Sequence, residues 1–454
     1  MSEHVVIVGG GFSGTRLARK LDRDSDVRVT LINDENYTTF SPMLPEVVGS
    51  TILPGQVIAP LRLMLGRHQE FVMGRVTSVN TKAQRVTYLS GGEGQELDYD
   101  HLVLALGARA NTEMIPGMAE HAIPLKLIGD AMRIRNHVIA RLEQAAHVSD
   151  PGKQRRLTHF AVVGGGFSGV EVAGEIHDFI HNAHRHYPRL KKEDLKVTVI
   201  HAGERLVPEL KAGLAEKAAR SMTRRGINLL FGALAKSIDE HGLTARFEDG
   251  REQRVEAATV ISTIGTAPNP LLEKLGLPME TGRLSTNPDM SIDGADNVWA
   301  LGDCAAVPNQ ASAGAAPPTA QFAVREADTL AENLKRSRRG EPTRAFSFGG
   351  LGTIATIGSK RGVAQVLGVP VIGFPAWLLW RAFYLLQMPT LSRKARIYVA
   401  WTWDMFFSND IAQLRFTSSD EADWQQPEKA AANSPAPPDS MSGEECEGRE
   451  AAER

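Results

Sequence analysis

Cysteine is almost absent from this sequence. Only Cys304 and Cys446 occur among the 454 residues, and no CxxC or CxxxxC pair is present. The sequence therefore excludes a vicinal dithiol redox centre and predicts no metal site built on cysteine. We expect no bound metal, and a reducing compartment such as the cytosol suits so little cysteine.

A strong net charge is lacking as well. The formal charge of −2 and the pI near 6.7 argue against a nucleic-acid partner. The acidic excess is concentrated in residues 421–454, which hold nine Asp and Glu against three Lys and Arg. Because residues 420–454 are also rich in Ala, Pro and Ser, they are typical of a disordered tail.

The aromatic stretch near the C-terminus is not a long apolar run. A membrane-spanning helix needs roughly 20 consecutive apolar residues. The stretch that begins at Phe374 is interrupted by Arg381 and stopped by Pro389. We therefore expect it to be too short to span a bilayer.

The sequence does contain one hexapeptide, GGGFSG, twice, at residues 9–14 and 164–169. Each copy follows an apolar run suited to a buried parallel strand and precedes a helical pattern. Strand, tight turn and helix form the context that a dinucleotide-binding fingerprint requires. Two copies predict an α/β protein with two Rossmann-like domains and two nucleotides, one of them a candidate flavin.

The glycines of each copy have separate roles. The first allows the tight turn, the third lets backbone approach a pyrophosphate, and the last lets helix and strand pack closely. The helix N-terminus then offers free N–H groups to the phosphates. The positions are Gly9, Gly11 and Gly14 in the first copy and Gly164, Gly166 and Gly169 in the second.

A ribose-binding acid is expected at the end of the second strand of each unit, ~20 residues past the fingerprint. In the first unit Asn33 stands there, followed by Asp34, and an Asn can also hydrogen-bond a ribose hydroxyl. In the second unit the position holds His201. An acid there selects an unphosphorylated ribose, so His201 with nearby Arg205 leaves NADPH open beside NADH.

Later strands also end in residues suited to a cofactor. The apolar segment 102–108 ends in small residues that let a cofactor lie against the backbone, and segment 259–266 closes the second unit in the same way. Segment 298–303 ends in Gly-Asp, where Asp303 can accept a sugar hydroxyl or only cap a turn. A helix predicted from residues 317–321 to Leu334 has an N-terminus that could face a flavin ring.

These segments divide the chain into six parts, two of which build the FAD-binding domain together. The predicted parts are 1–115, FAD-binding domain, first part; 116–154, connecting helical segment; 155–270, NAD(P)H-binding domain; 271–345, FAD-binding domain, second part, ending in a charged linker at 335–344; 346–418, C-terminal strands and amphipathic aromatic helices; and 419–454, disordered acidic tail.

Five segments together resemble the type II NADH dehydrogenases, which are monotopic flavoprotein NADH:quinone oxidoreductases. They are residues 40–47, residues 164–175 with a GxGxxGxExAGE pattern, residues 300–304, residues 355–358 and residues 401–404. The resemblance covers roughly residues 4–416 in the same order. It implies FAD at the first fingerprint, NADH at the second, and a C-terminal membrane-associating region.

The resemblance also assigns roles to individual residues. It places Glu171 near the nicotinamide and the flavin, and Gln321 in the quinone pocket, with Arg325 and Lys394 as further quinone residues. Arg325 departs from the Gln that the family often has there. The expected cofactor contacts are Gly9, Gly11, Phe12, Ser13, Gly14, Asn33, Asp34, Pro42, Val76, Ala105, Gly107, Asp303, Ala320, Gly164, Gly166, Phe167, Ser168, Gly169, His201 and Gly265.

The predicted reaction is a transfer of a hydride from NADH to FAD, with two electrons passed on to a membrane quinone and no proton pumping. Two alternatives stay open. One is a soluble NAD(P)H-dependent reductase of a ferredoxin- or rubredoxin-like carrier, and the other is an NADH-sensing flavoprotein with little turnover. Sulfide:quinone reductase ranks low because its chemistry requires a cysteine pair.

The predicted membrane contact lies in residues 374–416, on the cytoplasmic face of the inner (plasma) membrane. Aromatic rings and basic residues together suit the headgroup boundary. The rings include Trp377, Trp380, Trp401 and Trp403, and the basic residues are Arg381, Arg393, Lys394 and Arg396. A buried dimer interface is the alternative, since aromatic residues and Arg are enriched there too.

Overall fold

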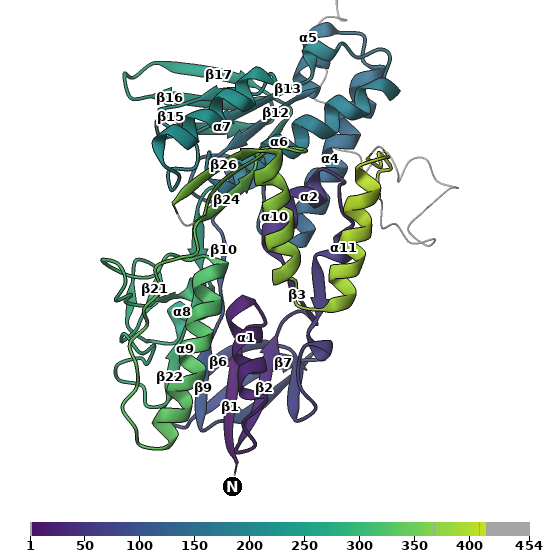
Figure 1. Cartoon of the computed structure of the whole chain (residues 1–454). Helices are drawn as coiled ribbons and strands as arrows, with labels where there is room; N and C mark the ends of the chain where they lie inside the picture. Colours follow the sequence, from purple (N-terminus) through teal and green to yellow (C-terminus); the bar gives the residue numbers. More distant parts are fainter. Residues whose placement is uncertain (1, 367, 408, 415–454) are drawn as a thin grey trace, which may run out of the picture. The chain divides into compact units, whose positions relative to one another are not determined.

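Two parallel five-stranded sheets each contain one of the glycine-rich turns (Figure 1). In both sheets the strand before the turn pairs in parallel with a strand on either side. The first sheet has the order β22 (Val298–Ala300), β9 (His101–Leu104), β1 (Glu3–Val8), β2 (Val27–Asn33), β5 (Gln69–Met73). The second has the order β11 (Ala122–Pro124), β18 (Thr259–Ser262), β12 (His159–Val163), β13 (Lys196–Ile200), β14 (Asn228–Leu230).

This computed structural model describes residues 2–366, 368–407 and 409–414, so the predicted tail at 419–454 lies outside the described residues. Residues up to Ile411 form one unit, and Ala412–Leu414 belong to a second. Because β22 joins β9, residues 298–300 return to the first sheet after the whole second sheet has been completed. The domain boundaries themselves stay a prediction.

Helices connect and cover the strands. Helix α9 continues to Arg338, so the first residues of the predicted charged linker at 335–344 are helical. Its basic last turn complements the negative end of the helix dipole. The helices are α1 (Phe12–Leu21), α2 (Leu44–Val48), α3 (Met118–His121), α4 (Ile128–His147), α5 (Pro151–Leu157), α6 (Phe167–Ala183), α7 (Ala212–Arg224), α8 (Pro270–Lys274) and α9 (Ala320–Arg338).

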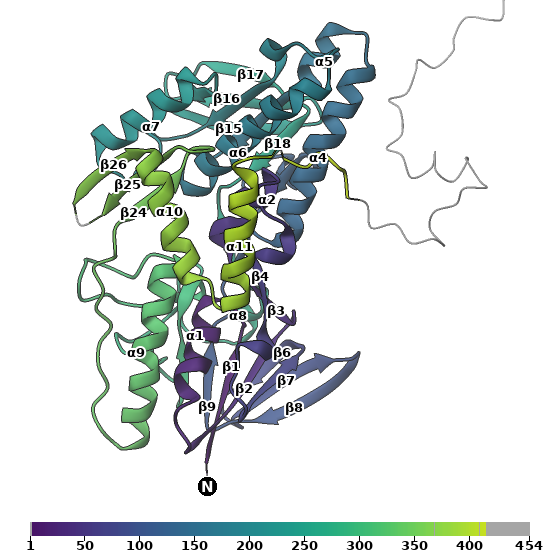
Figure 2. The same ribbon diagram turned by 45° about the vertical axis from the view of Figure 1, so that its right-hand side comes forward.

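Antiparallel strands follow the parallel ones, as period-two patterning predicts. One antiparallel sheet of this kind accompanies each of the two parallel sheets. Figure 2 shows β6, β7 and β8 near the first parallel sheet. They are β6 (Arg75–Asn80), β7 (Arg85–Ser90) and β8 (Glu93–Asp98), and β15 (Ala233–Asp239), β16 (Gly242–Phe247) and β17 (Glu252–Glu256). Short pairs are β3 (Tyr37–Thr39) with β4 (Ile58–Pro60), β10 (Ala108–Ala110) with β19 (Thr266–Pro268), and β21 (Arg283–Ser285) with β20 (Met279–Glu280) and β23 (Ala305–Ala306).

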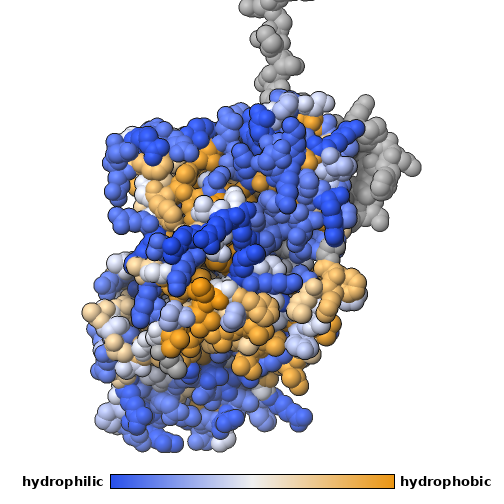
Figure 3. All heavy atoms as spheres, turned by 45° about the horizontal axis from the view of Figure 1, so that its top comes forward, coloured by the Kyte–Doolittle hydropathy of each residue, from blue (hydrophilic) through white to orange (hydrophobic). Residues whose placement is uncertain are grey.

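A third antiparallel sheet leads into two helices that lie side by side, α10 (Phe374–Gln387) and α11 (Leu391–Asp404). We call them the C-terminal hairpin. Its strands are β24 (Thr353–Thr356), β25 (Gly362–Val366) and β26 (Val369–Gly373). Figure 3 shows hydrophobic residues gathered across the middle of one face of the molecule (Figure 3). No helix within the described residues is both long and apolar enough to cross a membrane.

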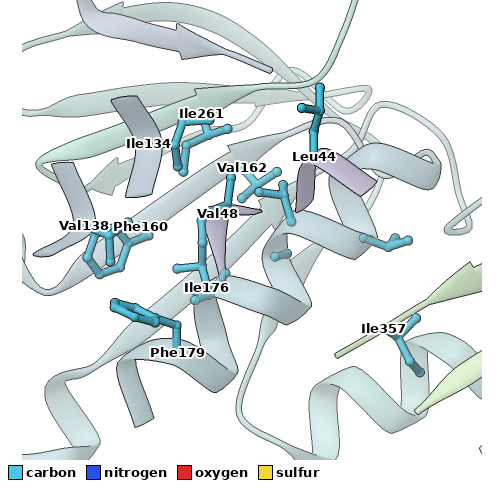
Figure 4. Close-up of a cluster of buried hydrophobic side chains, with 14 of the residues drawn as sticks. Leu44, Val48, Ile134, Val138, Phe160, Val162, Ile176, Phe179, Ile261 and Ile357 are labelled. Atoms are coloured by element: carbon cyan, nitrogen blue, oxygen red, sulfur yellow. The ribbon is translucent and has the colours of Figure 1, made fainter. Parts of the chain in front are cut away.

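The largest core joins segments that are far apart in the sequence. Val48 of α2 lies among side chains of α4, β12 and α6 (Figure 4). The same cluster includes Trp380 and Trp401 of the C-terminal hairpin. The hairpin is therefore part of the folded core and not an appendage to it.

Candidate functional site

The first glycine-rich turn connects β1 to α1 at the carboxyl edge of the first sheet. Gly9 has a φ of +112°, and a Cβ there would overlap the Ala105 carbonyl. A Cβ on Gly14 would overlap the carbonyl oxygen of Gly9. Glycine is required at both positions, because a side chain at Gly9 would be strained and would displace the Ala105 backbone, and one at Gly14 would push the helix away from the turn.

Gly11, the N-cap of α1, has a different environment. A Cβ built there would meet no atom within 4 Å, so the turn leaves open space in front of the helix N-terminus. Unpaired N–H groups at that end suit a phosphate. Gly107, with a φ of +62°, likewise has no atom within 4 Å of a built Cβ. These residues fit a dinucleotide.

Asn33 at the end of β2 fastens this turn. Its Oδ1 accepts a 2.7 Å hydrogen bond from the Gly10 N–H, and its Nδ2 donates to the Glu35 carbonyl at 2.7 Å. Asp34 is exposed and pairs with Arg75 at 2.9 Å. The amide predicted to bind a ribose thus already holds the backbone of the glycine turn.

The Gly302-Asp303 pair lies directly after β22 and beside the first turn. Gly302 has a φ of +77°, and a Cβ there would meet Ser13 Oγ at 2.7 Å. The Gly302 N–H donates to the buried carboxyl of Glu326 in α9 at 2.6 Å, and burial raises the pKa of Glu326 to about 7. Asp303 lies 3.5 Å from the Lys126 ammonium.

The other residues predicted at the first site are spread over several elements. Phe12 and Ser13 begin α1 and Ala320 begins α9. Ala105 is buried just after β9, Pro42 lies in a short 3₁₀ turn, and Val76 is buried on β6.

The second turn repeats the geometry of the first. Gly164 has a φ of +117°, a Cβ on Gly169 would overlap the Gly164 carbonyl, and a Cβ on Gly166 would meet nothing within 4 Å. His201 occupies the place of Asn33, with its Nδ1 accepting from the Gly165 N–H at 3.2 Å. Phe167 and Ser168 begin α6, and Gly265, with a φ of +73°, follows β18.

Glu171, one turn into α6, is 6% exposed and faces the C-terminal hairpin. Its Oε1 accepts from the Thr356 N–H at 3.1 Å and from the Trp380 indole N–H at 3.0 Å. Burial raises the pKa of Glu171 to about 8, against the opposing effect of these two hydrogen bonds. At neutral pH the carboxyl is protonated and can donate a proton.

A second buried carboxyl, Glu46 of α2, meets the other helix of the hairpin. Its Oε2 accepts from the Trp401 indole N–H at 2.9 Å, and burial raises the pKa of Glu46 to about 7. Arg381 lies between Glu46 at 3.8 Å and Asp404 at 3.3 Å. The hairpin therefore makes a buried polar contact with an element from each half of the molecule.

These contacts overturn part of the membrane prediction. Arg381 is 6% exposed and its guanidinium lies 3.8 Å from the Trp377 ring centroid, so the prediction that it meets lipid is wrong. Trp377, Trp380 and Trp401 are buried too, and only Trp403 of the four hairpin tryptophans is exposed. The indole N–H groups of Trp380 and Trp401 donate to buried Glu carboxyls, and the two rings contact each other, so these tryptophans are satisfied inside the protein.

The three predicted quinone residues each bind a different partner. Gln321 Oε1 accepts from the Leu351 N–H at 3.2 Å. Arg325 is exposed, lies 3.7 Å from Asp328 and stacks on Phe348. Lys394 Nζ donates to the Leu386 carbonyl at 2.8 Å. Their quinone role stays a prediction.

The comparisons with known proteins agree with this architecture. A model of the pyridine nucleotide-disulphide oxidoreductase family matches residues 3–327. The type II NADH:quinone oxidoreductase Ndh of Mycobacterium tuberculosis is 31% identical over 427 residues, which cover 91% of this chain and 90% of that protein. The chain belongs to the type II NADH:quinone oxidoreductase family.

One further relative supports the assignment, and one solved structure shows the same fold. The type II NADH:quinone oxidoreductase of Staphylococcus aureus is 28% identical over 373 residues, covering 81% of this chain and 91% of that protein. The solved structure of NDH2 from Plasmodium falciparum in complex with NADH has a TM-score of 0.85 at 20% identity, covering 91% of this chain and 100% of that one. That likeness confirms the predicted α/β dinucleotide-binding fold.

Sequence reasoning missed several residues that shape the type II oxidoreductase site. Glu326 and Trp380 were assigned no contact there, although Glu326 binds Gly302, the neighbour of Asp303, and Trp380 binds Glu171; Trp401, likewise unassigned, binds the buried Glu46. For Glu326 the signal was an acid on the apolar face of a helix, and such an acid needs a buried partner.

Proposed function

We propose that this protein oxidises NADH with a bound FAD and passes the two electrons to a quinone. Family membership supports the reaction, and the two complete glycine-rich turns carry the proposal in the structure. FAD belongs at the Gly9 turn, because Gly302-Asp303 completes that site, and NADH belongs at the Gly164 turn. FAD supplies the redox chemistry, accepting a hydride and giving up two electrons.

The residues of this chain bind the two nucleotides, orient them, and supply protons. Reduction of a quinone by NADH consumes one proton from solution, so a proton must reach the site. Glu171 supports this role, because it is protonated near pH 7 and belongs to the helix that starts at the NADH turn. Glu175 lies one helical turn further on the same face and lines a cavity of about 570 Å³ together with Asp178. We assign proton delivery to Glu171.

NADH, and not NADPH, is the proposed donor. His201 accepts a hydrogen bond from backbone through Nδ1, so the ring is neutral and brings no charge to a ribose phosphate. The Arg205 guanidinium donates to the Pro208 carbonyl at 3.2 Å. Comparing kcat/KM for the two donors tests this, and a clear preference for NADPH would overturn it.

A lipophilic acceptor requires contact with a membrane, and we propose that the C-terminal hairpin provides it at the cytoplasmic face of the inner membrane. Its buried side carries Trp377, Trp380 and Trp401, while its outer side exposes Trp403 and other large apolar residues. Leu386, near the end of α10, and Leu391, the first residue of α11, are 73% and 82% exposed. Gln321 and Lys394 are the proposed quinone contacts.

The reaction is tested by following NADH consumption by the FAD-loaded protein with and without a soluble quinone. We expect rapid turnover only when the quinone is present. Equal slow oxidation in both cases would favour a sensor, and turnover only with a ferredoxin- or rubredoxin-like carrier would favour a soluble reductase.

Membrane contact is tested by flotation with anionic vesicles. Deleting the hairpin would strip Glu46 and Glu171 of buried partners, so surface substitutions are the cleaner choice. We expect Leu386→Glu with Leu391→Glu to stay at the bottom while the wild type floats. The matched control, Leu63→Glu with Leu127→Glu, changes leucines of similar exposure elsewhere and should float. If the hairpin variant floats, these leucines do not provide the membrane contact. If it runs as a monomer where the wild type is a dimer, the surface is a dimer interface instead.

A further inference from the structure

Both backbone polar groups of Gly165, the middle glycine of the second turn, form hydrogen bonds. The Gly165 N–H donates to His201 Nδ1 at 3.2 Å, and the Gly165 carbonyl accepts from the Val207 N–H at 2.8 Å. A Cβ on Gly165 would meet His201 Cγ at 2.6 Å, so ring and turn are in direct contact. Any change in the ring reaches the backbone that receives the pyrophosphate.

The direction of the first bond fixes the state of the ring. A backbone N–H can only donate, so His201 Nδ1 must present its lone pair, and the ring proton sits on Nε2. Nε2 is buried without a hydrogen-bond partner among the described residues and packs against Gly203. A second ring proton would have to sit on Nδ1, where it would face the Gly165 N–H.

The surroundings of the ring favour this neutral state. Burial lowers the pKa of His201, and the Arg205 backbone and the Glu209 carboxylate oppose that shift. Glu204 and the Arg205 side chain are exposed in the same loop. The backbone N–H of His201 donates to the Leu230 carbonyl at 2.9 Å, which holds the residue in place.

The first turn supplies the comparison within the same chain. Asn33 Oδ1 holds the Gly10 N–H from the same place that His201 Nδ1 holds the Gly165 N–H. An amide oxygen does not take up a proton at any pH the fold survives, whereas an imidazole does. One turn has a permanent acceptor and the other has an acceptor that acid removes.

We propose that His201 is the positioning residue of the NADH site, which fixes the Gly164–Gly166 turn through its Nδ1 lone pair and releases that turn when the ring is protonated. The inference rests on NADH binding at the second turn. It makes nucleotide affinity fall in acid at this site alone, while the Asn33-held FAD site keeps its affinity.

The test measures the dissociation constant of NAD⁺ for the FAD-loaded protein by calorimetric titration between about pH 8 and about pH 4.5, a range that extends well below the ordinary pKa of histidine because burial lowers the pKa of His201. Loss of one hydrogen bond predicts about tenfold weaker binding at the acid end for the wild type. His201→Asn places an oxygen where Nδ1 stands, as Asn33 does, and should bind NAD⁺ normally with no change across this range. His201→Ala should bind weakly at every pH.

Bound flavin, measured by absorbance after desalting at each pH, is the control and should stay constant. If His201→Asn keeps the acid-induced weakening of the wild type, or binds as weakly as His201→Ala at about pH 8, the proposal is wrong. If the wild type binds neither NAD⁺ nor NADH at any pH, the proposed function itself fails.

Discussion

The two turns share six identical residues, yet the helices that follow them have basic residues in one case and acidic residues in the other at the same positions. Arg16 and Lys20 of α1 both pair with Asp328 of α9, at 2.7 Å and 3.2 Å. Glu171 and Glu175 stand at the matching places of α6 and are buried. The glycines determine how backbone receives a nucleotide, and the next helical turns determine what else the site can do.

The difference follows from what covers each helix. The charged side chains of α1 reach a partly exposed acid, where ion pairs add little stability. The same face of α6 is covered by α2 and by the C-terminal hairpin, so its carboxyls lose water and hold their protons. We therefore propose that the first helix only helps to bind a nucleotide, whereas the second also supplies a proton.

A side chain placed in the open space at Gly11 or at Gly166 should distinguish the functions of the two turns most clearly. Gly11→Val should fold, because its Cβ meets no atom, but the branched side chain would enter the pyrophosphate position. We expect loss of bound FAD and at least about a hundredfold loss of turnover. Gly166→Val should retain flavin and lose NADH binding instead. Full flavin absorbance in purified Gly11→Val would reverse the assignment of the two sites.

Exchanging one carboxyl for an amide tests the contrast between the helices. Glu171→Gln keeps the size of the side chain but removes the proton, so we expect kcat to fall by about a hundredfold with little change in KM for NADH. The wild-type rate should decline as pH rises through about 8, where Glu171 ionises, and the variant should lack that decline. Arg16→Gln is the matched control, and a comparable effect there would remove the distinction.

The smallest expected effect concerns a carboxyl that serves only the first site. Glu326→Ala leaves the buried Gly302 N–H unpaired, which costs about 1–3 kcal/mol of unfolding free energy, while Glu326→Gln should cost less. Flavin should also leave the Ala variant faster. Thermal unfolding and flavin release measure the two effects.

The raised pKa of Glu326 determines how its contribution to the free energy of unfolding changes with pH. The folded state holds this proton up to about pH 7, whereas the unfolded chain releases it near the ordinary value of 4.5. The folded state thus binds more protons in that window, and stability falls as pH rises through it. Glu326→Gln should show a shallower fall than the wild type, and an unchanged slope would contradict the assignment.

Local patterns were enough to predict the fold. The apolar runs before Gly9 and Gly164, the glycine spacing and the alternating strands all act within short segments, and the structure has each of them. The strand pattern placed Asp303 after a buried strand, and the resemblance to the family, not the local pattern, assigned it to the FAD site. The roles of the predicted site residues stay predictions.

The pairings between distant segments could not be predicted. Trp380 and Glu171 are 209 positions apart, and nothing in either local pattern indicates the other. Arg381 read as a surface residue because arginine is rarely buried alone. Its burial becomes favourable only once Glu46 and Asp404 meet it from separate elements. Such compensation is a property of the assembled core.

Cys304 directly follows Asp303 and is 1% exposed, with its thiol donating weakly to the Leu301 and Leu104 carbonyls. Burial raises the pKa of this thiol to about 12, so almost no thiolate exists at neutral pH. Thiolate is the form that peroxide and alkylating reagents attack. Beside the proposed FAD site, burial therefore protects the only sulfhydryl of the described residues from oxidation and alkylation. Labelling of Cys304 would therefore report the moment when the turn after β22 opens.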